Sequence, residues 1–357
     1  MRRSTWKIRV SFFVVFALVI ISQPFAQFLF AKSLPLNQQK NGRSMLSAFR
    51  PVVAKTRASI VQIKNAKGVI ALGTIVDANG FIVTKASQLT DYIVCQLSDG
   101  RILQPKIIGI NKKQDVALLK VSATNLPAIK WKSDITLKRG QWLATPGTKK
   151  SPIAIGVVSV EQRAIPERSG VLGIQITQDE RGPKISLVFP RSSAERAGLK
   201  VGDVVTAIAG NEVKSREQLI SFVRKRHTGD LLTLQILRGK NVLVINATLG
   251  EAPLQMMGRG AKQNRMGGAL SSRRAGFPQV VQHDTILKPE ECGGIVVNLS
   301  GDAVGLNIAR AGRTESYVIP AKIMIDIIAK LRSVKKKTSS SFRSVSDGPL
   351  APPLPQK

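Results

Sequence analysis

Two short segments of the sequence carry residues of the types that perform acyl transfer. Asp115 opens the apolar run 116–119, and Cys292 stands before two glycines and the apolar run 295–297. Acyl transfer needs a nucleophile, a general base that activates it, and a carboxylate that orients the base. The sequence therefore offers a carboxylate and a candidate thiol nucleophile, whereas neither segment contains a histidine that could be the base.

Histidine and cysteine are scarce in this chain. It has two histidines, His227 and His283, and two cysteines, Cys95 and Cys292. Two cysteines are too few for a disulfide framework, and Cys95 lies in an apolar run, where we expect a buried core thiol. No spacing of cysteine and histidine suggests a metal site, so we expect neither a metal nor another cofactor.

Strand-like runs separated by tight turns surround Asp115. The 29 glycines and the aromatic content of only 5% favour many short strands over helical bundles. Asn79-Gly80 joins two apolar runs, and this dipeptide supplies the positive φ angles that a tight hairpin needs. The spacing predicts a small antiparallel barrel. The runs predicted as its strands are 59–63, 74–76, 81–84, 92–97, 106–110 and 116–121.

A second set of strands is interrupted by a unit of different character, residues 168–250. This unit combines strands with two short helices, one ended by Gly198 and one capped by Ser215. The strands outside it are predicted at 142–147, 155–160, 279–281, 294–297 and 304–308.

The remaining segments are predicted as helices, a loop and a tail. Pro51 fits the first turn of a helix that starts near Arg50, and apolar spacing predicts another helix over 321–331. Residues 251–275 are rich in glycine, arginine and methionine and are expected to form a loop. The basic and proline-rich tail 333–357 is expected to be disordered.

Three motifs follow one another within residues 168–250: Ala197-Gly198-Leu199, Gly202-Asp203 and Gly210. With these motifs, residues 168–250 resemble a PDZ domain of the kind attached to bacterial HtrA-type proteases. The resemblance implies that a peptide adds as a strand beside Ile174 and Ile176, and that backbone N–H groups hold its terminal carboxylate. The carboxylate loop would be Val171, Leu172, Gly173 and Ile174, and the groove would be lined by Leu219, Phe222 and Val223. The alternative is that some of these apolar residues are only core.

The flanking parts, 45–165 and 255–332, resemble the trypsin-like protease domain of the same family. The evidence includes Asp115-Val116-Ala117-Leu118-Leu119-Lys120, Cys292-Gly293-Gly294 and Tyr317-Val318-Ile319-Pro320. The resemblance implies a mostly β chain, a trypsin-like double β-barrel with an inserted α+β PDZ domain. In the family the PDZ domain usually follows the protease domain, whereas here it interrupts the second barrel.

The resemblance also implies a degenerate active site with Asp115 as the carboxylate. Ser87 stands where the family has the catalytic histidine, and Cys292 stands where it has the serine nucleophile. Glu290 replaces a glycine whose N–H is an oxyanion donor, and its carboxylate would oppose a developing negative charge. Without a base, we expect the Cys292 thiol to titrate near its ordinary pKa of about 8.5.

The two histidines do not fill this gap in the family pattern. The resemblance places His283 on the wall of the substrate pocket, from which it could in principle be recruited as a base. His227 follows the second helix of the PDZ unit and is expected to lie on the surface.

The N-terminus has the pattern of an export signal. Four basic residues within 2–9 precede the apolar run 10–21, which is typical of a secretory signal. A signal peptide within 1–31, cleaved after Ala26 or Ala31, and an uncleaved signal anchor are the two leading alternatives, and a buried helix is the third. Both leading alternatives export the body of the protein, either free in the periplasm or anchored to the membrane and facing outward.

The net charge of +32 indicates a strongly cationic surface. Such a surface suits an anionic cell envelope or anionic partners, and DNA or RNA binding is the alternative. Against specific nucleic-acid binding, the chain has no recognition-helix pattern and no strand motif of interleaved basic and aromatic residues, and it carries an export signal.

Three function classes follow. The leading hypothesis is an exported pseudoprotease that binds peptide or protein C-termini, or unfolded segments, through its PDZ domain. The rival is an active endopeptidase that uses Cys292 as nucleophile, and the third class is a cationic structural protein of the envelope. A second copy of the chain is a further candidate partner.

Overall fold

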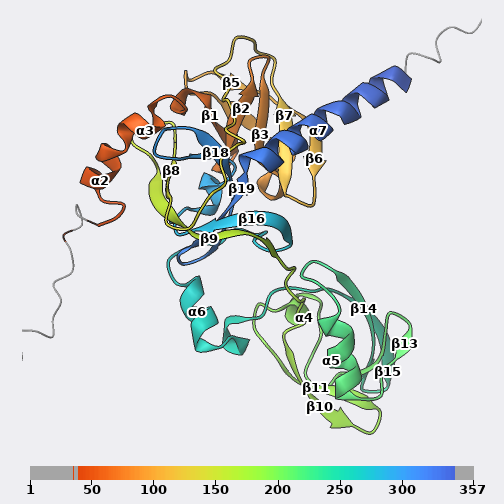
Figure 1. Ribbon diagram of the computed structural model, residues 1–357. Helices are drawn as coiled ribbons and strands as arrows, with labels where there is room; N and C mark the ends of the chain where they lie inside the picture. The colour runs from red at the N-terminus through yellow and green to blue at the C-terminus, as the bar shows by residue number, and fades with distance from the viewer. Residues whose placement is uncertain (1–34, 36–38, 342–357) are drawn as a thin grey trace, which may run out of the picture. The chain divides into compact units, whose positions relative to one another are not determined.

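Seven antiparallel strands in the first third of the chain form one sheet, in the order β5-β4-β1-β2-β3-β7-β6 (Figure 1). Gly80 turns β2 into β3 with a φ of 92°, as the Asn-Gly pair predicts. The apolar faces of these strands enclose a core that includes Ile63, Ile82 and Leu119. The strands are β1 (Ile60–Asn65), β2 (Gly68–Asp77), β3 (Phe81–Lys85), β4 (Val94–Gln96), β5 (Ile102–Leu103), β6 (Lys106–Asn111) and β7 (Val116–Lys120).

A closed antiparallel barrel follows, in the order β16-β19-β18-β17-β8-β9. Its central strand β18 is buried along its whole length, because β17 and β19 flank it and the helix α7 packs against it. The strands are β8 (Trp142–Thr145), β9 (Ala154–Ile165), β16 (Phe277–His283), β17 (Ile295–Val297), β18 (Ala303–Gly312) and β19 (Glu315–Pro320).

Residues 166–276 are inserted between β9 and β16, which pair with each other in the barrel (Figure 1). The insert contains a second sheet, in the order β10-β11-β12-β14-β15, with β13 paired to β12. Its two ends are joined, because Val171 and Gly250 each donate a backbone hydrogen bond to the other. Its elements are β10 (Ile174–Asp179), β11 (Gly182–Val188), α4 (Ser193–Arg196), β12 (Val204–Ile208), β13 (Asn211–Glu212), α5 (Arg216–Arg224), β14 (Leu231–Arg238) and β15 (Asn241–Thr248).

Most of the helices match the expectation. Pro51 lies in the first turn of α3 (Arg50–Ala54), which α2 (Arg43–Ala48) precedes. Ser215 caps α5 with a full capping box, as its sequence predicts.

Two expectations were wrong. The predicted loop 251–275 contains the 3-10 turn η5 (Leu254–Met256) and the helix α6 (Arg259–Arg265). The last helix, α7 (Ala321–Ser341), runs ten residues beyond its predicted end, because no proline or glycine stands before Gly348 to stop it. The first nine residues of the expected disordered tail are therefore helical.

This computed structural model describes residue 35 and residues 39–341. The predicted signal segment 1–31 and the residues after 341 lie outside that part of the chain. The chain divides into residues 1–45 and residues 46–357, and all the elements from α3 onward belong to the second unit. Among the described residues, no helix is both long and apolar enough to cross a bilayer.

Candidate functional site

Asp115 and Ser87 lie together, as the degenerate site predicts. The pairing of β3 with β7 sets Lys85 opposite Val116 and so brings the ends of both strands to one place. The Asp115 carboxylate accepts hydrogen bonds from the Ser87 backbone N–H (2.7 Å) and from the Ser87 hydroxyl (2.8 Å). Ser87 therefore bonds to the carboxylate where a catalytic base would bond to it, but a serine hydroxyl is not a base at neutral pH.

Lys85 is the residue that sequence reasoning missed. Its side chain is fully buried, and its ammonium donates to Asp115 Oδ2 (2.8 Å), to the Ile308 carbonyl (2.6 Å) and to the Arg273 carbonyl (3.1 Å). An ammonium group has three N–H donors, so these three acceptors use all of them. A buried charge must be paired in this way to be tolerated. The carboxylate that would orient a catalytic base is therefore committed to an ion pair.

Cys292 lies at the end of a short 3-10 turn, η6 (Pro289–Glu291), which also contains Glu290. The Cys292 N–H donates to the Pro289 carbonyl at 3.1 Å. In trypsin-like enzymes the N–H of the nucleophile is one of the two oxyanion donors. The Cys292 N–H instead points to a carbonyl of its own loop, and the resemblance assigns Glu290 to the position of the other donor.

The Cys292 thiol is completely buried. Burial raises its pKa from 9.0 to about 11, although the positive charge of Lys85 and a contact with the Ser271 hydroxyl act in the opposite direction. The expectation of an ordinary thiol pKa was therefore wrong, because nothing in the residues around Cys292 indicates that the folded chain encloses the thiol. A thiol with so high a pKa is almost entirely protonated at neutral pH and is a poor nucleophile.

The two histidines lie on other elements of the fold. His283 is fully buried in β16, where Val158 of β9 and Ser316 of β19 are its strand partners. His227 is half-exposed, and its Nδ1 lies 3.0 Å from a carboxylate oxygen of Glu167. Among the described residues, no group of acidic, cysteine and histidine side chains could hold a metal ion.

The loop predicted to bind a carboxylate turns at Gly173. Its φ is +77°, and an added Cβ would lie 2.5 Å from Ser192 Cβ, so both the backbone angle and the space require glycine. Within residues 39–341, no group accepts a hydrogen bond from the N–H of Leu172 or Gly173. The Val171 N–H differs, because it donates to the Gly250 carbonyl at 2.8 Å. Val171 therefore closes the domain and does not offer its N–H to a ligand.

The groove is predicted between β10, which is the edge strand of the sheet, and the helix α5, and these two elements contact each other (Figure 1). Ile174 and Ile176 of β10, and Phe222 and Val223 of α5, are half-buried on the domain core, which leaves part of each side chain open to a ligand. Leu219 is only 2% exposed. It belongs to the core beneath the groove, so its assignment as a groove residue was wrong.

Comparison with known proteins gives one family match. Residues 170–249 match the PDZ domain family. That match covers less than a third of the chain, and it coincides with the inserted sheet and its helices.

Curated relatives carry the name "Probable periplasmic serine endoprotease DegP-like". The alignment with the relative from Halomonas elongata is 273 positions long with 25% identity, and it covers 53% of this chain and 58% of that protein. The alignment with the relative from Ectopseudomonas mendocina is 324 positions long with 22% identity, and it covers 66% of this chain and 68% of that protein. The alignment with the relative from Pseudomonas fulva is 108 positions long with 36% identity, and it covers 29% of this chain and 22% of that protein. The chain thus spans little more than half the length of the first of these relatives.

Two solved structures also align with the chain. The serine endoprotease from Yersinia pestis is 18% identical, and the HtrA-type protease AlgW with decapeptide is 15% identical. Each alignment covers 57% of this chain and 98% of the solved chain, with TM-scores of 0.28 and 0.27. Scores this low add no support for the placement of individual site residues.

The strand order and the PDZ match define the class of protein, a mostly β chain with a trypsin-like fold and an inserted α+β PDZ domain. Within that class, the chain is an HtrA-like protein.

Proposed function

We propose that this chain is an exported pseudoprotease, and that its PDZ domain binds free C-termini of peptides or proteins. The observation that carries the first half is the buried Lys85–Asp115 pair with Ser87 beside it. General-base catalysis requires a group that accepts a proton from the nucleophile within hydrogen-bond reach. The Asp115 carboxylate is already bonded to Lys85 and Ser87, and the ammonium and hydroxyl groups that surround it are not bases at neutral pH.

Two further features act against turnover. Burial holds the Cys292 thiol protonated, and the Cys292 N–H is bonded to the Pro289 carbonyl. Loss of one oxyanion donor lowers kcat by about 10²–10³ in enzymes where it has been measured. These effects are independent of the missing base, so they reduce any residual activity further.

The decisive assay for the first half is cleavage of an unfolded casein substrate by the purified chain. We expect no cleavage by the wild type. We also expect none from Ser87→His combined with Glu290→Gly, because Lys85 still holds Asp115. Wild-type cleavage that disappears in Cys292→Ala would overturn the proposal in favour of an active cysteine endopeptidase.

The second half rests on the Gly173 turn, whose neighbouring N–H groups lie beside the edge strand β10. Free backbone N–H groups in a tight turn are suited to a terminal carboxylate, and a free strand edge is suited to an added peptide strand. The full-length chain should bind a peptide with an apolar last residue, and amidation of the peptide terminus should remove most of the affinity. Equal affinities for the free and amidated peptides would refute this assignment.

Export to the periplasm is supported by the N-terminal sequence and by the periplasmic names of the relatives. Fractionation of cells that produce the chain tests this part. Recovery in the cytoplasmic fraction would contradict it.

A further inference from the structure

Beyond Asn307, one edge of the strand β18 is not paired with another strand of the barrel. β17 pairs with β18 from Val297 back to Ile295, and the backbone of Gly293 and Gly294 continues this pairing to Asn307. Beyond that point the chain turns away at Cys292. The backbone groups of Ile308 and Arg310 therefore need other partners, because buried backbone groups are costly when unpaired.

The partners come from the segment that leads from α6 to β16. Ser271 donates its N–H to the Arg310 carbonyl (3.0 Å), and its hydroxyl accepts from the Arg310 N–H (3.0 Å). The same hydroxyl lies 3.9 Å from the Cys292 sulfur. Ser271 is completely buried. This segment therefore occupies the edge of β18 through one backbone bond and one side-chain bond at Ser271, directly beside Cys292.

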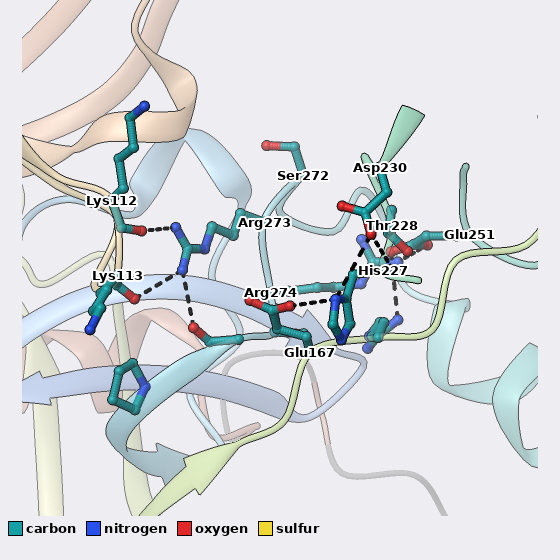
Figure 2. A pocket seen from close by; sticks show the side chains of 14 residues that line it. Lys112, Lys113, Glu167, His227, Thr228, Asp230, Glu251, Ser272, Arg273 and Arg274 are labelled. Atoms are coloured by element: carbon teal, nitrogen blue, oxygen red, sulfur yellow. Dashed lines mark hydrogen bonds and ion pairs between the residues drawn. The ribbon is translucent and has the colours of Figure 1, made fainter. Parts of the chain in front are cut away.

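Bonds on both sides of Ser271 hold the segment in place. On one side, Arg310 donates to the Gly267 carbonyl at 2.6 Å. On the other side, the Arg273 carbonyl accepts from the Lys85 ammonium at 3.1 Å. The Arg273 guanidinium donates to the carbonyls of Lys112, Lys113 and Gly276 (Figure 2).

Arg274 adds a buried anchor to the end of the segment. Its side chain is 7% exposed, donates to the Ser271 carbonyl at 2.9 Å, and forms an ion pair with Glu251. Glu251 also pairs with Arg168 and Arg265. The Glu251 carboxylate thus ties the segment to both connections of the PDZ insert. Glu251, Arg168 and Arg274 also line a cavity of about 740 Å³.

We infer that residues 267–274 are a strap that covers the edge of β18 beside Cys292. The strap takes the edge of β18 that an extended polypeptide would need and seals the Cys292 thiol from solvent. In the strapped state, peptide binding is confined to the PDZ domain. The inference rests on the proposed function only for the identity of Cys292 as the nucleophile position.

A matched pair of variants tests the strap. Ser271→Arg places a long side chain where the structure has no space, whereas Ser272→Arg places the same side chain at the neighbouring exposed position. The readout is the rate of iodoacetamide modification at each cysteine of the full-length chain, mapped by mass spectrometry. We expect Ser271→Arg to raise the rate at Cys292 by at least about tenfold through local opening, and Ser272→Arg to leave it at the wild-type rate.

Cys95 serves as an internal control, because it is buried in the first sheet, away from the strap. If the modification rate at Cys95 rises together with that at Cys292, Ser271→Arg unfolds the chain. In that case hydrogen exchange of the wild type tests the strap instead. The Ser271 N–H should exchange at least about a hundredfold more slowly than the N–H of Ser272. Fast exchange at Ser271, or rapid modification of wild-type Cys292, would overturn the strap.

The outcomes separate the strap from the pseudoprotease. An exposed thiol in Ser271→Arg without casein cleavage supports both. Casein cleavage gained by Ser271→Arg would keep the strap and overturn the pseudoprotease. Rapid modification of the wild-type Cys292 thiol would overturn the strap, but it would not affect the proposal that the PDZ domain binds free C-termini.

Discussion

Replacement of Lys85 by methionine should strongly destabilise the first sheet and the barrel, which Lys85 joins. Lys85→Met keeps most of the side-chain volume but removes the cation from Asp115, which is only 2% exposed. Removal of one partner from a buried ion pair costs about 3–5 kcal/mol. Ser87 keeps its two hydrogen bonds to the carboxylate, so we expect the lower end of that range, about 3 kcal/mol.

Urea unfolding followed by tryptophan fluorescence measures this loss, because Trp142 begins β8 of the barrel and Trp131 forms a bridge with Ala303 of β18, whereas residues 170–249 contain no tryptophan. The control is Lys106→Met, a lysine exposed on β6 of the same sheet, which should change the free energy of unfolding by less than about 0.5 kcal/mol. The double variant Lys85→Met/Asp115→Asn should recover at least about 1 kcal/mol relative to the sum of the single changes. A loss below about 1 kcal/mol in Lys85→Met, or strict additivity in the double variant, would refute the ion pair as a stabilising unit.

Three other predictions concern the thiol and the PDZ domain. Because burial raises the pKa of Cys292 from 9.0 to about 11, the unfolded chain loses the thiol proton at a lower pH than the folded chain. The contribution of this thiol to the free energy of unfolding is therefore complete below pH 9 and falls by about 1.4 kcal/mol at pH 10. Denaturant titrations should show that Cys292→Ala removes this loss of stability between pH 9 and pH 10. Gly173→Ala should weaken binding of a free C-terminal peptide by at least about tenfold in calorimetry. The control is Gly229→Ala, because Gly229 also has a positive φ of +99° but has open space around it. This control should lower the free energy of unfolding by only about 1 kcal/mol. Arg238→Gln should lower the unfolding free energy of the PDZ domain by about 3 kcal/mol in thermal melts, because Arg238 holds the nearly buried Asp203 with two bonds of 2.8 Å, and an unchanged melting temperature would contradict this.

The sequence was a good guide to the parts of the molecule that local patterns determine. The hairpin at Gly80, the capped helix α5 and the turn at Gly173 follow from residue types at fixed spacings. The contact between Ser87 and Asp115 could be expected from the family pattern alone, since each residue stands at a known position of that pattern.

The contacts that close the site could not be predicted in the same way. Lys85 ends an apolar strand, and a charged residue at a strand end is ordinarily solvated, so only the three-dimensional pairing reveals that it is buried against Asp115. Residues 251–275 have no hydrophobic periodicity, and the strap is held by backbone groups and arginines that reach residues far along the chain. One signal was available, because Lys85 follows an apolar run, and a lysine that is buried with its strand must be paired with an anion.

The paired ends of the PDZ insert have a consequence for folding. β9 and β16 can pair only after the intervening residues 166–276 have been brought into a loop of 111 residues. If the PDZ domain folds first, the bridge between Val171 and Gly250 shortens this loop to about 31 residues. The shorter loop lowers the entropic cost of bringing β9 and β16 together by about 1 kcal/mol. Early folding of the insert thus favours closure of the barrel around it, and a variant whose PDZ domain folds slowly should also close its barrel slowly.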